Sequence, residues 1–376
     1  MAQPATATIP RSRRAEGARR IPLWFMALTG AMVALGFTVR SAGGAPGPRQ
    51  SHPDETKPQA GREAGRGRHA DTPSDIPARG WKDILLRAYA NIGRDRVITI
   101  AAGVTFYSIL ALFPAIAALV SLYGLFADPG TIASHLDSIS DVLPGGAVSV
   151  IGDELKRITA QRSTLGFASV IALATALWSA NAGIKSLFDA LNLVYNEPEK
   201  RGLIKLNAVS LAFTAATIGF LLLALGAMVV LPPALDHLGI AAGADMVVRV
   251  LRWPALLLAA AFWLAALYRF GPSRAEPKWR WISWGTALAA VLWLVVSLLF
   301  SWYAANFGNY NKTYGSLGAA IGFMVWIWLS IIVVLLGAEV DAEMEHQTAR
   351  DTTEGAAKPM GGRGATMADT VGPATD

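Results

Sequence analysis

Six long stretches of mostly apolar residues limit the folds that this chain can adopt. Roughly 20 apolar residues cross the hydrocarbon core of a bilayer as an α-helix, and each stretch reaches about that length. Only 16% of the residues are charged and 53% are hydrophobic, whereas about 25% charged is usual in a soluble domain. We therefore predict an all-α, polytopic integral membrane bundle with six core transmembrane helices. The predicted spans are residues 98–126, 165–191, 206–231, 250–270, 282–305 and 316–340.

Lysine and arginine gather in the loops on one side of this predicted bundle. From residue 81 onward, eleven basic residues precede the first span or lie in the second and fourth loops, against six on the opposite side. Short basic loops mark the cytoplasmic side of a membrane protein, so both ends of the core are expected in the cytoplasm. The net charge of +6 fits this bias and the attraction of anionic headgroups. The expected partner is the lipid bilayer, and no nucleic acid is expected.

The first 80 residues fall outside the predicted core. Residues 21–39 are apolar, about one membrane thickness long, and follow Arg19 and Arg20, a pattern typical of a signal sequence or an extra span. An extra N-terminal hydrophobic helix, a cleaved signal and a start codon placed too far upstream are the alternatives. Residues 40–79 are rich in proline, glycine and arginine, so we predict a disordered basic linker there. Residues 346–376 are predicted to form a disordered tail. The predicted domains are therefore 1–80, 81–345 and 346–376.

Four polar or ionisable side chains interrupt the apolar character of the second span. Asn181, Lys185, Asp189 and Asn192 are spaced four, four and three residues apart, so they share one face of a helix. An ionisable group in hydrocarbon costs roughly 2.5 kcal/mol or more, and such groups normally face a protein interior or a watery cavity. This face is the leading candidate for function. The alternative is that Lys185 and Asp189 neutralise each other and only hold helices together.

Further candidate residues lie on both sides of the membrane. Arg269 and Glu339 end the fourth and sixth spans and could line a cytoplasmic vestibule. Pro114 removes a backbone hydrogen bond from the first span, so we predict a bend there, with Tyr107 as a neighbouring gate residue. A second group near the fifth and sixth spans predicts either an outer mouth or an aromatic belt at the interface. Its members are Tyr303, Asn306, Tyr310, Asn311 and Tyr314.

Motifs for enzymatic chemistry are sparse. Cysteine is absent, which excludes disulfides and thiolate chemistry. A metal-dependent ribonuclease needs clustered His, Asp and Glu ligands. Of the five histidines, two lie in the predicted linker (His52, His69) and two in predicted outer segments (His135, His237). On the cytoplasmic side only His346 lies near acids, in a Glu-x-x-His pair with Glu343 that we attribute to chance. The sequence also lacks a Gly-rich phosphate loop with Lys and Ser/Thr. We therefore predict no enzymatic activity, no cofactor and no metal.

Five blocks of the sequence carry a family resemblance. They are AAGVTFYSILALFPAIAAL from Ala101, LWSANAGIKSLFDALNLVYNEP from Leu177, LYRFGP from Leu267, NYNKTYGSLGAAIGFMVWIWLS from Asn309 and LLGAEVDAE from Leu335. In this order, within residues 81–345, they resemble the YihY/virulence factor BrkB family of bacterial inner-membrane proteins. The resemblance implies a six-span, all-helical protein of the inner membrane with both ends inside. It supplies no established activity: members are linked by name to serum resistance and transport, and an older label, ribonuclease BN, is generally regarded as a misassignment.

The polar face of the second span suggests a passive or ion-coupled transporter or a lipid-handling protein, with a small solute or a lipid as substrate. The alternative is a non-catalytic envelope scaffold whose buried charges only fix helix register. Neither the polarity of the face nor its spacing selects a substrate. Gly315, Gly318 and Gly322 allow the sixth span to approach a neighbouring helix closely, within the monomer or across a homo-oligomer.

Overall fold

The structure is a computed structural model that describes residues 65–123, 167–226, 242–307 and 316–375. The apolar segment 21–39, whose fate the sequence leaves open, lies outside these residues. Within them the chain forms helices and loops and no strand, apart from an isolated bridge between Pro277 and Thr353. This confirms the all-α class for the described part of the chain.

Each predicted span coincides with a helix. These helices are α4 (Val97–Tyr123), α7 (Phe167–Val194), α8 (Leu203–Leu225), α10 (Ala242–Phe270), α11 (Ser283–Phe307) and α13 (Ser316–Glu345). Shorter elements lie between and after them. They are η1 (Pro73–Asp75), α3 (Ala78–Arg94), η4 (Trp279–Trp281) and α14 (Thr366–Asp369).

Fewer of these helices meet the length and hydropathy expected of a complete membrane span. Among the described residues, Leu203–Ala224, Ser283–Tyr303 and Ala320–Glu345 are long and apolar enough to cross a membrane alone. A fourth crossing results if Ala78–Arg94 and Val97–Leu112, which meet at 62°, form one broken span. The described chain therefore provides three or four membrane-capable segments, compared with the six predicted.

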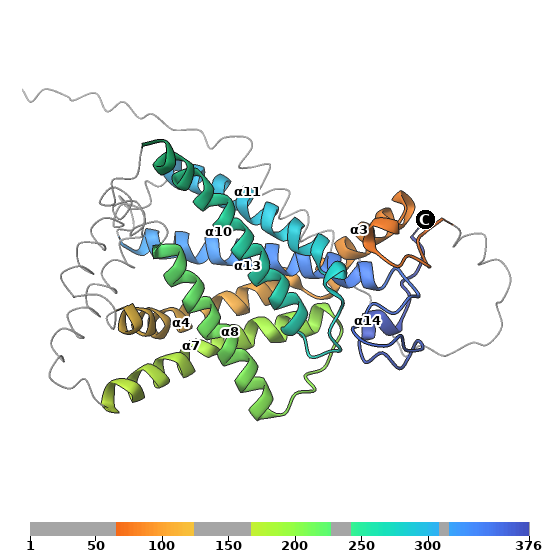
Figure 1. Cartoon of the computed structure of the whole chain (residues 1–376), viewed down its shortest axis with the longest axis horizontal. Coiled ribbons are helices and arrows are strands. Elements are labelled where there is room, and N and C mark those ends of the chain that lie inside the picture. The colour runs from red at the N-terminus through yellow and green to blue at the C-terminus, as the bar shows by residue number, and fades with distance from the viewer. Residues whose placement is uncertain (1–64, 124–166, 227–241, 308–315, 376) are drawn as a thin grey trace, which may run out of the picture. The chain divides into compact units, whose positions relative to one another are not determined.

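Helix α13 lies in the middle of the described bundle, with α11 against one side and α4, α7 and α3 against others (Figure 1). Large apolar side chains such as Phe188, Leu267 and Leu335 are fully buried around it. Helices α4 and α7 pack against each other at Gly183, where a Cβ would lie 3.4 Å from the Ser108 Cα, an ordinary van der Waals contact. In lipid, such close fit stabilises helix pairs through dispersion rather than through exclusion of water.

Helices α11 and α13 meet along a contact of glycines and tryptophans. The backbones approach so closely at Gly285 and Gly337 that a Cβ on Gly337 would lie 2.7 Å from the Gly285 carbonyl oxygen. Two interhelical hydrogen bonds reinforce this contact, each from a tryptophan of one helix to a serine of the other. They join Trp293 Nε1 to Ser330 Oγ (3.1 Å) and Trp326 Nε1 to Ser297 Oγ (3.2 Å).

The proline of the first span lies within a continuous helix, because α4 runs from Val97 to Tyr123 through Pro114. The bend that the structure shows in this region lies between α3 and α4 and measures 62°. Arg96 has a φ of +50° at this junction, a left-handed conformation that stops α3 and redirects the chain. A bend within α4 at Pro114 itself stays a prediction.

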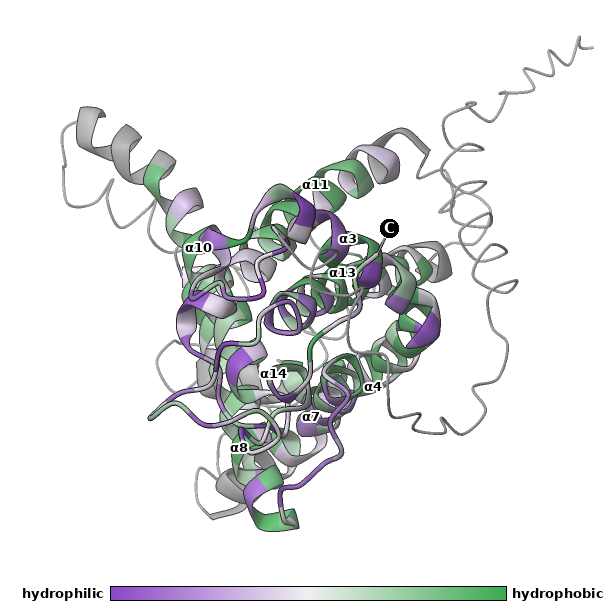
Figure 2. Ribbon diagram, turned by 90° about the vertical axis from the view of Figure 1, so that its right-hand side faces the viewer, coloured by the Kyte–Doolittle hydropathy of each residue, from purple (hydrophilic) through white to green (hydrophobic). Residues whose placement is uncertain are grey.

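One end of the bundle collects most of the described charged side chains, and Figure 2 looks onto it. We call it the charged end. It consists of α3, the last turns of α7, α10 and α13, the loops 195–202 and 271–282, and the tail 346–375. The sequence predicts a disordered tail, but the structure packs these residues against the helix ends, with Thr348 and Thr352 fully buried. Arg363 contributes to this order, because its guanidinium donates hydrogen bonds to the carbonyl oxygens of Ala349, Arg350, Lys358 and Ala368.

Replacing Arg363 with alanine should release the tail without unfolding the bundle, because these charge-assisted hydrogen bonds hold the tail to itself. We expect faster cleavage of residues 346–375 by a protease, followed by mass spectrometry, and an unchanged midpoint of thermal unfolding. Arg350→Ala is the matched control, since that side chain is 59% exposed and its ion pair with Asp71 measures 3.7 Å. Equal cleavage of the wild type and Arg363→Ala would contradict the role given to Arg363.

Candidate functional site

The polar face of α7 begins at Asn181, where this helix crosses α8. Asn181 is 1% exposed, and its Oδ1 accepts a hydrogen bond from Thr214 Oγ1 at 3.2 Å. Its amide nitrogen is buried and has no acceptor among the described residues, and on α8 the amide oxygen of Asn207 has no donor there. An unsatisfied buried polar atom costs about 1–3 kcal/mol. The contact between α7 and α8 is therefore not optimised for packing alone.

Lys185 and Asp189 continue this face toward the charged end. The Lys185 Nζ lies 5.3 Å from the centre of the Trp178 ring, a cation–π distance. Asp189 is exposed and experiences the charges of Glu199, Arg201 and Lys185. The described structure contains no direct ion pair between Lys185 and Asp189 within 4.0 Å. Their mutual neutralisation is thus long-range, and both side chains are available to other groups.

Asn192 has a different environment from the other three residues. Its Oδ1 accepts a hydrogen bond from the backbone N–H of Ser273 (2.6 Å), and its Nδ2 donates to Glu199 Oε2 (3.0 Å). Arg201 also binds both oxygens of Glu199, and these hydrogen bonds, Arg201 foremost, outweigh burial and lower the pKa of Glu199 to about 2. Asn192 therefore joins the loops 195–202 and 271–282 around an ionised carboxylate, whereas Asn181, Lys185 and Asp189 share the helix face.

The last turns of α13 place four acidic side chains in the charged end. All four are at most 2% exposed, and residues four apart share a helix face. Glu343 therefore faces α3 together with Glu339, whereas Asp341 faces α11 together with Glu345. The described partners differ from acid to acid. Glu343 accepts hydrogen bonds from Arg87 Nε (2.5 Å) and Asn91 Nδ2 (2.9 Å), Glu345 from Arg274 Nη1 (2.8 Å), and Asp341 from the Gly285 N–H (2.8 Å).

Arg269 and Glu339, predicted to line one vestibule, make separate contacts. The Arg269 guanidinium donates to the Pro277 carbonyl oxygen and pairs with Glu276 (3.2 Å) and Glu354 (3.4 Å). It also lies 4.8 Å above the Trp279 ring. Glu339 is fully buried on α13. Both residues lie at the charged end, but the described contacts do not bring their side chains together.

The predicted gate and outer mouth are described only in part. Tyr107 is exposed on α4, and its ring lies 5.5 Å from that of Phe106. Tyr303 is partly exposed on α11, 6.4 Å from the ring of Phe300. Asn306 lies in α11, but its side chain falls outside the described part. The remaining mouth residues, Tyr310, Asn311 and Tyr314, also fall outside it.

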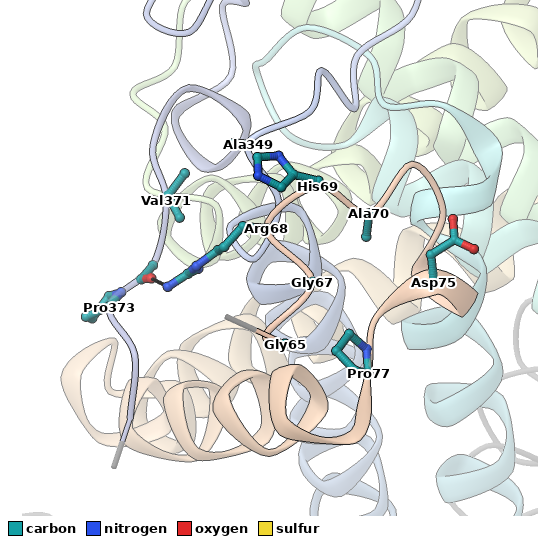
Figure 3. A pocket seen from close by; sticks show the side chains of 11 residues that line it. Gly65, Gly67, Arg68, His69, Ala70, Asp75, Pro77, Ala349, Val371 and Pro373 are labelled. Atoms are coloured by element: carbon teal, nitrogen blue, oxygen red, sulfur yellow. Dashed lines mark hydrogen bonds between the residues drawn. The ribbon is translucent and has the colours of Figure 1, made fainter. Parts of the chain in front are cut away.

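A cavity of about 840 Å³ lies between residues 65–77 and the tail at the charged end (Figure 3). Arg68 on its wall donates hydrogen bonds to the backbone carbonyl oxygens of Gly372 (2.7 Å) and Gln347 (3.2 Å). His69 and Asp75 also line the cavity. The charge of Arg68 thus helps to hold the tail. Elsewhere in the described chain, as here, no three His, Asp or Glu side chains are grouped to hold a metal ion.

Most residues of the charged end were not predicted from the sequence to be functional. Arg87 and Asn91 lie on α3, which the analysis did not single out, and Asp95 lies at the junction between α3 and α4. A signal was present, because Ile84, Ala88 and Asn91 recur at helical spacing and all are buried. Of the alternating acids of α13, the sequence singled out Glu339 as a vestibule residue and Glu343 as one half of a Glu-x-x-His pair, but it pointed to no role for Asp341 or Glu345.

Comparison with known proteins gives a consistent result. The family model described as virulence factor BrkB matches residues 88–361. A Bacillus subtilis (strain 168) protein, provisionally named ribonuclease-like protein YfkH, is 30% identical over 69% of this chain and 93% of its own length. A UPF0761 membrane protein of Vibrio vulnificus (strain YJ016) is 27% identical over 72% of this chain and 87% of its own. Among solved structures, none matches the chain.

Proposed function

Because the chain belongs to the virulence factor BrkB family of membrane proteins, we propose that it acts as a transporter or lipid-handling protein of the bacterial inner membrane. The observation that carries this proposal is the unsatisfied amide of Asn181, buried where α7 crosses α8. A polar group left without a partner inside a membrane bundle is costly, and such groups commonly mark substrate or ion paths. No ribonuclease activity is proposed, since the described residues contain no group of three His, Asp or Glu side chains that could hold a metal ion.

We further propose that α4, α7, α8, α10, α11 and α13 all cross the membrane and that the charged end faces the cytoplasm. The support is the excess of basic residues on that side of the predicted spans. The described charged end contains Arg87, Arg201, Arg269 and Arg274, each paired with a carboxylate.

The face of α7 provides graded access from this end. Asp189 is exposed, Lys185 is half-buried one turn away, and Asn181 is buried one further turn along. Eight residues of α-helix span about 12 Å, so the face leads from solvent into the bundle. A polar solute or lipid headgroup entering at Asp189 would meet the Lys185 cation and then the free amide of Asn181. The proposal uses these three residues and leaves Asn192 as a brace between loops.

The test is flux of solutes and exchange of fluorescent lipid in proteoliposomes. Loss of one hydrogen-bonding partner worth about 1.4 kcal/mol lowers a rate about tenfold, so we expect at least that loss in Asp189→Asn and in Asn181→Leu. Asp71→Asn, an exposed acid (68%) in residues 65–77, is the matched control and should retain wild-type flux. All variants are compared at equal reconstitution and equal thermal stability.

The opposite pattern would favour a scaffold. If flux is unchanged while Asp189→Asn and Asn181→Leu lower the unfolding midpoint, the α7 face holds helices together and conducts nothing. That result would contradict the transport proposal.

A further inference from the structure

Glu339 is a buried acid whose neighbouring donor, the Asn91 amide, donates to Glu343 at 2.9 Å. It is 0% exposed, and neither Oε1 nor Oε2 has a partner among the described residues. The three other acids at this end of α13 each accept at least one hydrogen bond. An isolated buried carboxylate is among the most unfavourable groups in a protein interior and normally takes up a proton or a counter-ion. The environment of Glu339 therefore lacks a positively charged ligand.

Asp95 faces Glu339 from the junction between α3 and α4. It is 8% exposed, and its Oδ2 also has no donor among the described residues. The two carboxyl groups lie within hydrogen-bonding reach of each other. Two ionised carboxylates cannot form that hydrogen bond, because neither holds a proton. Like charges in one buried site also oppose each other's ionisation. A single proton would supply the missing donor to both groups.

We infer that Asp95 and Glu339 form a proton-binding site in which one proton is shared between the two carboxyl groups. Binding changes the charge of the pair from −2 to −1 and forms one O–H···O⁻ hydrogen bond, the strong, charge-assisted kind. The site joins α13 to the 62° junction of α3 and α4. It is independent of the α7 face, and neither residue takes part in the proposed transport path.

Neighbouring groups restrict the binding to one proton. Glu343 lies one turn further along the same face of α13, but Arg87 offsets its charge, and His346 Nδ1 lies 3.5 Å from its Oε2. Arg94 favours the ionised form of Asp95. On the other face of α13, Asp341 and Glu345 bind the Gly285 N–H and Arg274. The charged and polar groups that face the pair directly are Glu343 on α13 and Asn91 and Arg94 on α3. Arg87 and His346 contact Glu343 and so act on the pair indirectly.

Infrared spectroscopy of the full-length protein in detergent tests the site directly. A protonated carboxyl group has a C=O stretching band separate from that of a carboxylate, and the band shifts in D₂O. We expect the wild type to show this band at neutral pH. Glu339→Gln should remove the contribution of the pair to this band, because the glutamine amide donates to Asp95 and leaves that group ionised. Asp95→Asn should remove it as well, because the asparagine amide then donates to Glu339. Any contribution from Asp341, whose Oδ2 also lacks a donor among the described residues, should remain in both variants.

The pH dependence of stability gives a second readout of the same proton. An acid that stays protonated in the folded state but ionises in the unfolded state destabilises the protein as pH rises above its unfolded pKa of about 4.3. The unfolding constant of the wild type should then increase more steeply with pH than that of Glu339→Gln, by up to about tenfold per pH unit. Glu276→Gln, which changes a 52% exposed acid, is the control and should keep the wild-type band and slope.

Three results would overturn the inference. One is the absence of the band from the wild type, and another is a band of undiminished intensity in Glu339→Gln. The third is a cation in place of the proton. In that case sodium chloride would stabilise the wild type at fixed pH where choline chloride would not, and Glu339→Gln would abolish the difference.

Discussion

Replacing Arg274 with methionine is expected to lower the free energy of unfolding by about 3–5 kcal/mol, because it leaves Glu345 buried without its counter-charge. The Arg274 Nη1 and Glu345 Oε2 atoms lie 2.8 Å apart, and the two side chains are 1% and 0% exposed. Burial alone would lower the pKa of Arg274, but the Glu345 carboxylate and Tyr195 outweigh it and raise the pKa. The guanidinium also lies 4.0 Å above the Tyr195 ring. Methionine replaces the volume of the side chain but not these interactions.

Tryptophan fluorescence during unfolding of the purified protein in detergent measures this loss. Arg350→Met makes the same exchange at a 59% exposed position and should change the stability by less than about 0.5 kcal/mol. The double change Arg274→Met with Glu345→Gln should recover part of the loss, since it removes the unpaired charge. An Arg274→Met protein as stable as the wild type would mean that Glu345 finds another partner or solvent.

Gly337→Val is expected to force α11 and α13 apart and to lower stability by about 3 kcal/mol, the upper part of the usual range for overpacking. A Cβ at Gly337 would lie 2.7 Å from both the Gly285 carbonyl oxygen and the Ala289 Cβ. Backbone atoms cannot rotate away as the end of a flexible side chain can. The loss also affects the hydrogen bond from Tyr268 Oη to the Val334 carbonyl oxygen (2.7 Å), because the tyrosine hydroxyl occupies the same space.

The matched control lies on the same helix. A Cβ at Gly322 would find the Phe300 ring at 3.9 Å, an ordinary contact, so Gly322→Val should retain folding. Size-exclusion chromatography in detergent and the unfolding midpoint distinguish the two variants. If both behave alike, the close approach of α11 and α13 does not determine the stability of the bundle. The sequence analysis singled out Gly322 and not Gly337, so this pair also tests which glycine the packing requires.

Sequence reasoning located helices better than contacts. The predicted spans agree with the start of α13 at Ser316 and with the end of α10 at Phe270, because a long apolar run is a local property of the chain. The other ends differ: α10 begins eight residues earlier and α13 ends five residues later than predicted. The α7 face was also visible, since helical spacing places Asn181, Lys185 and Asp189 together in any helix. Asn192 fits the same spacing, yet in the structure its side chain forms hydrogen bonds with Ser273 and Glu199 in the loops. Helical spacing alone cannot predict which residues of a helix face contact a loop.

The sequence by itself determined that the described chain is helical and built for a membrane, because the length and hydropathy of each apolar run are set by neighbouring residues. Only the tertiary structure decided what the acids of α13 do. Glu339, Asp341, Glu343 and Glu345 alternate identically in the sequence. The structure gives the last two arginine partners, gives Asp341 a backbone N–H, and turns Glu339 toward Asp95. Partners so distant in the chain meet only through packing, and in a medium of low dielectric the identity of the partner decides the protonation and the stability of each acid.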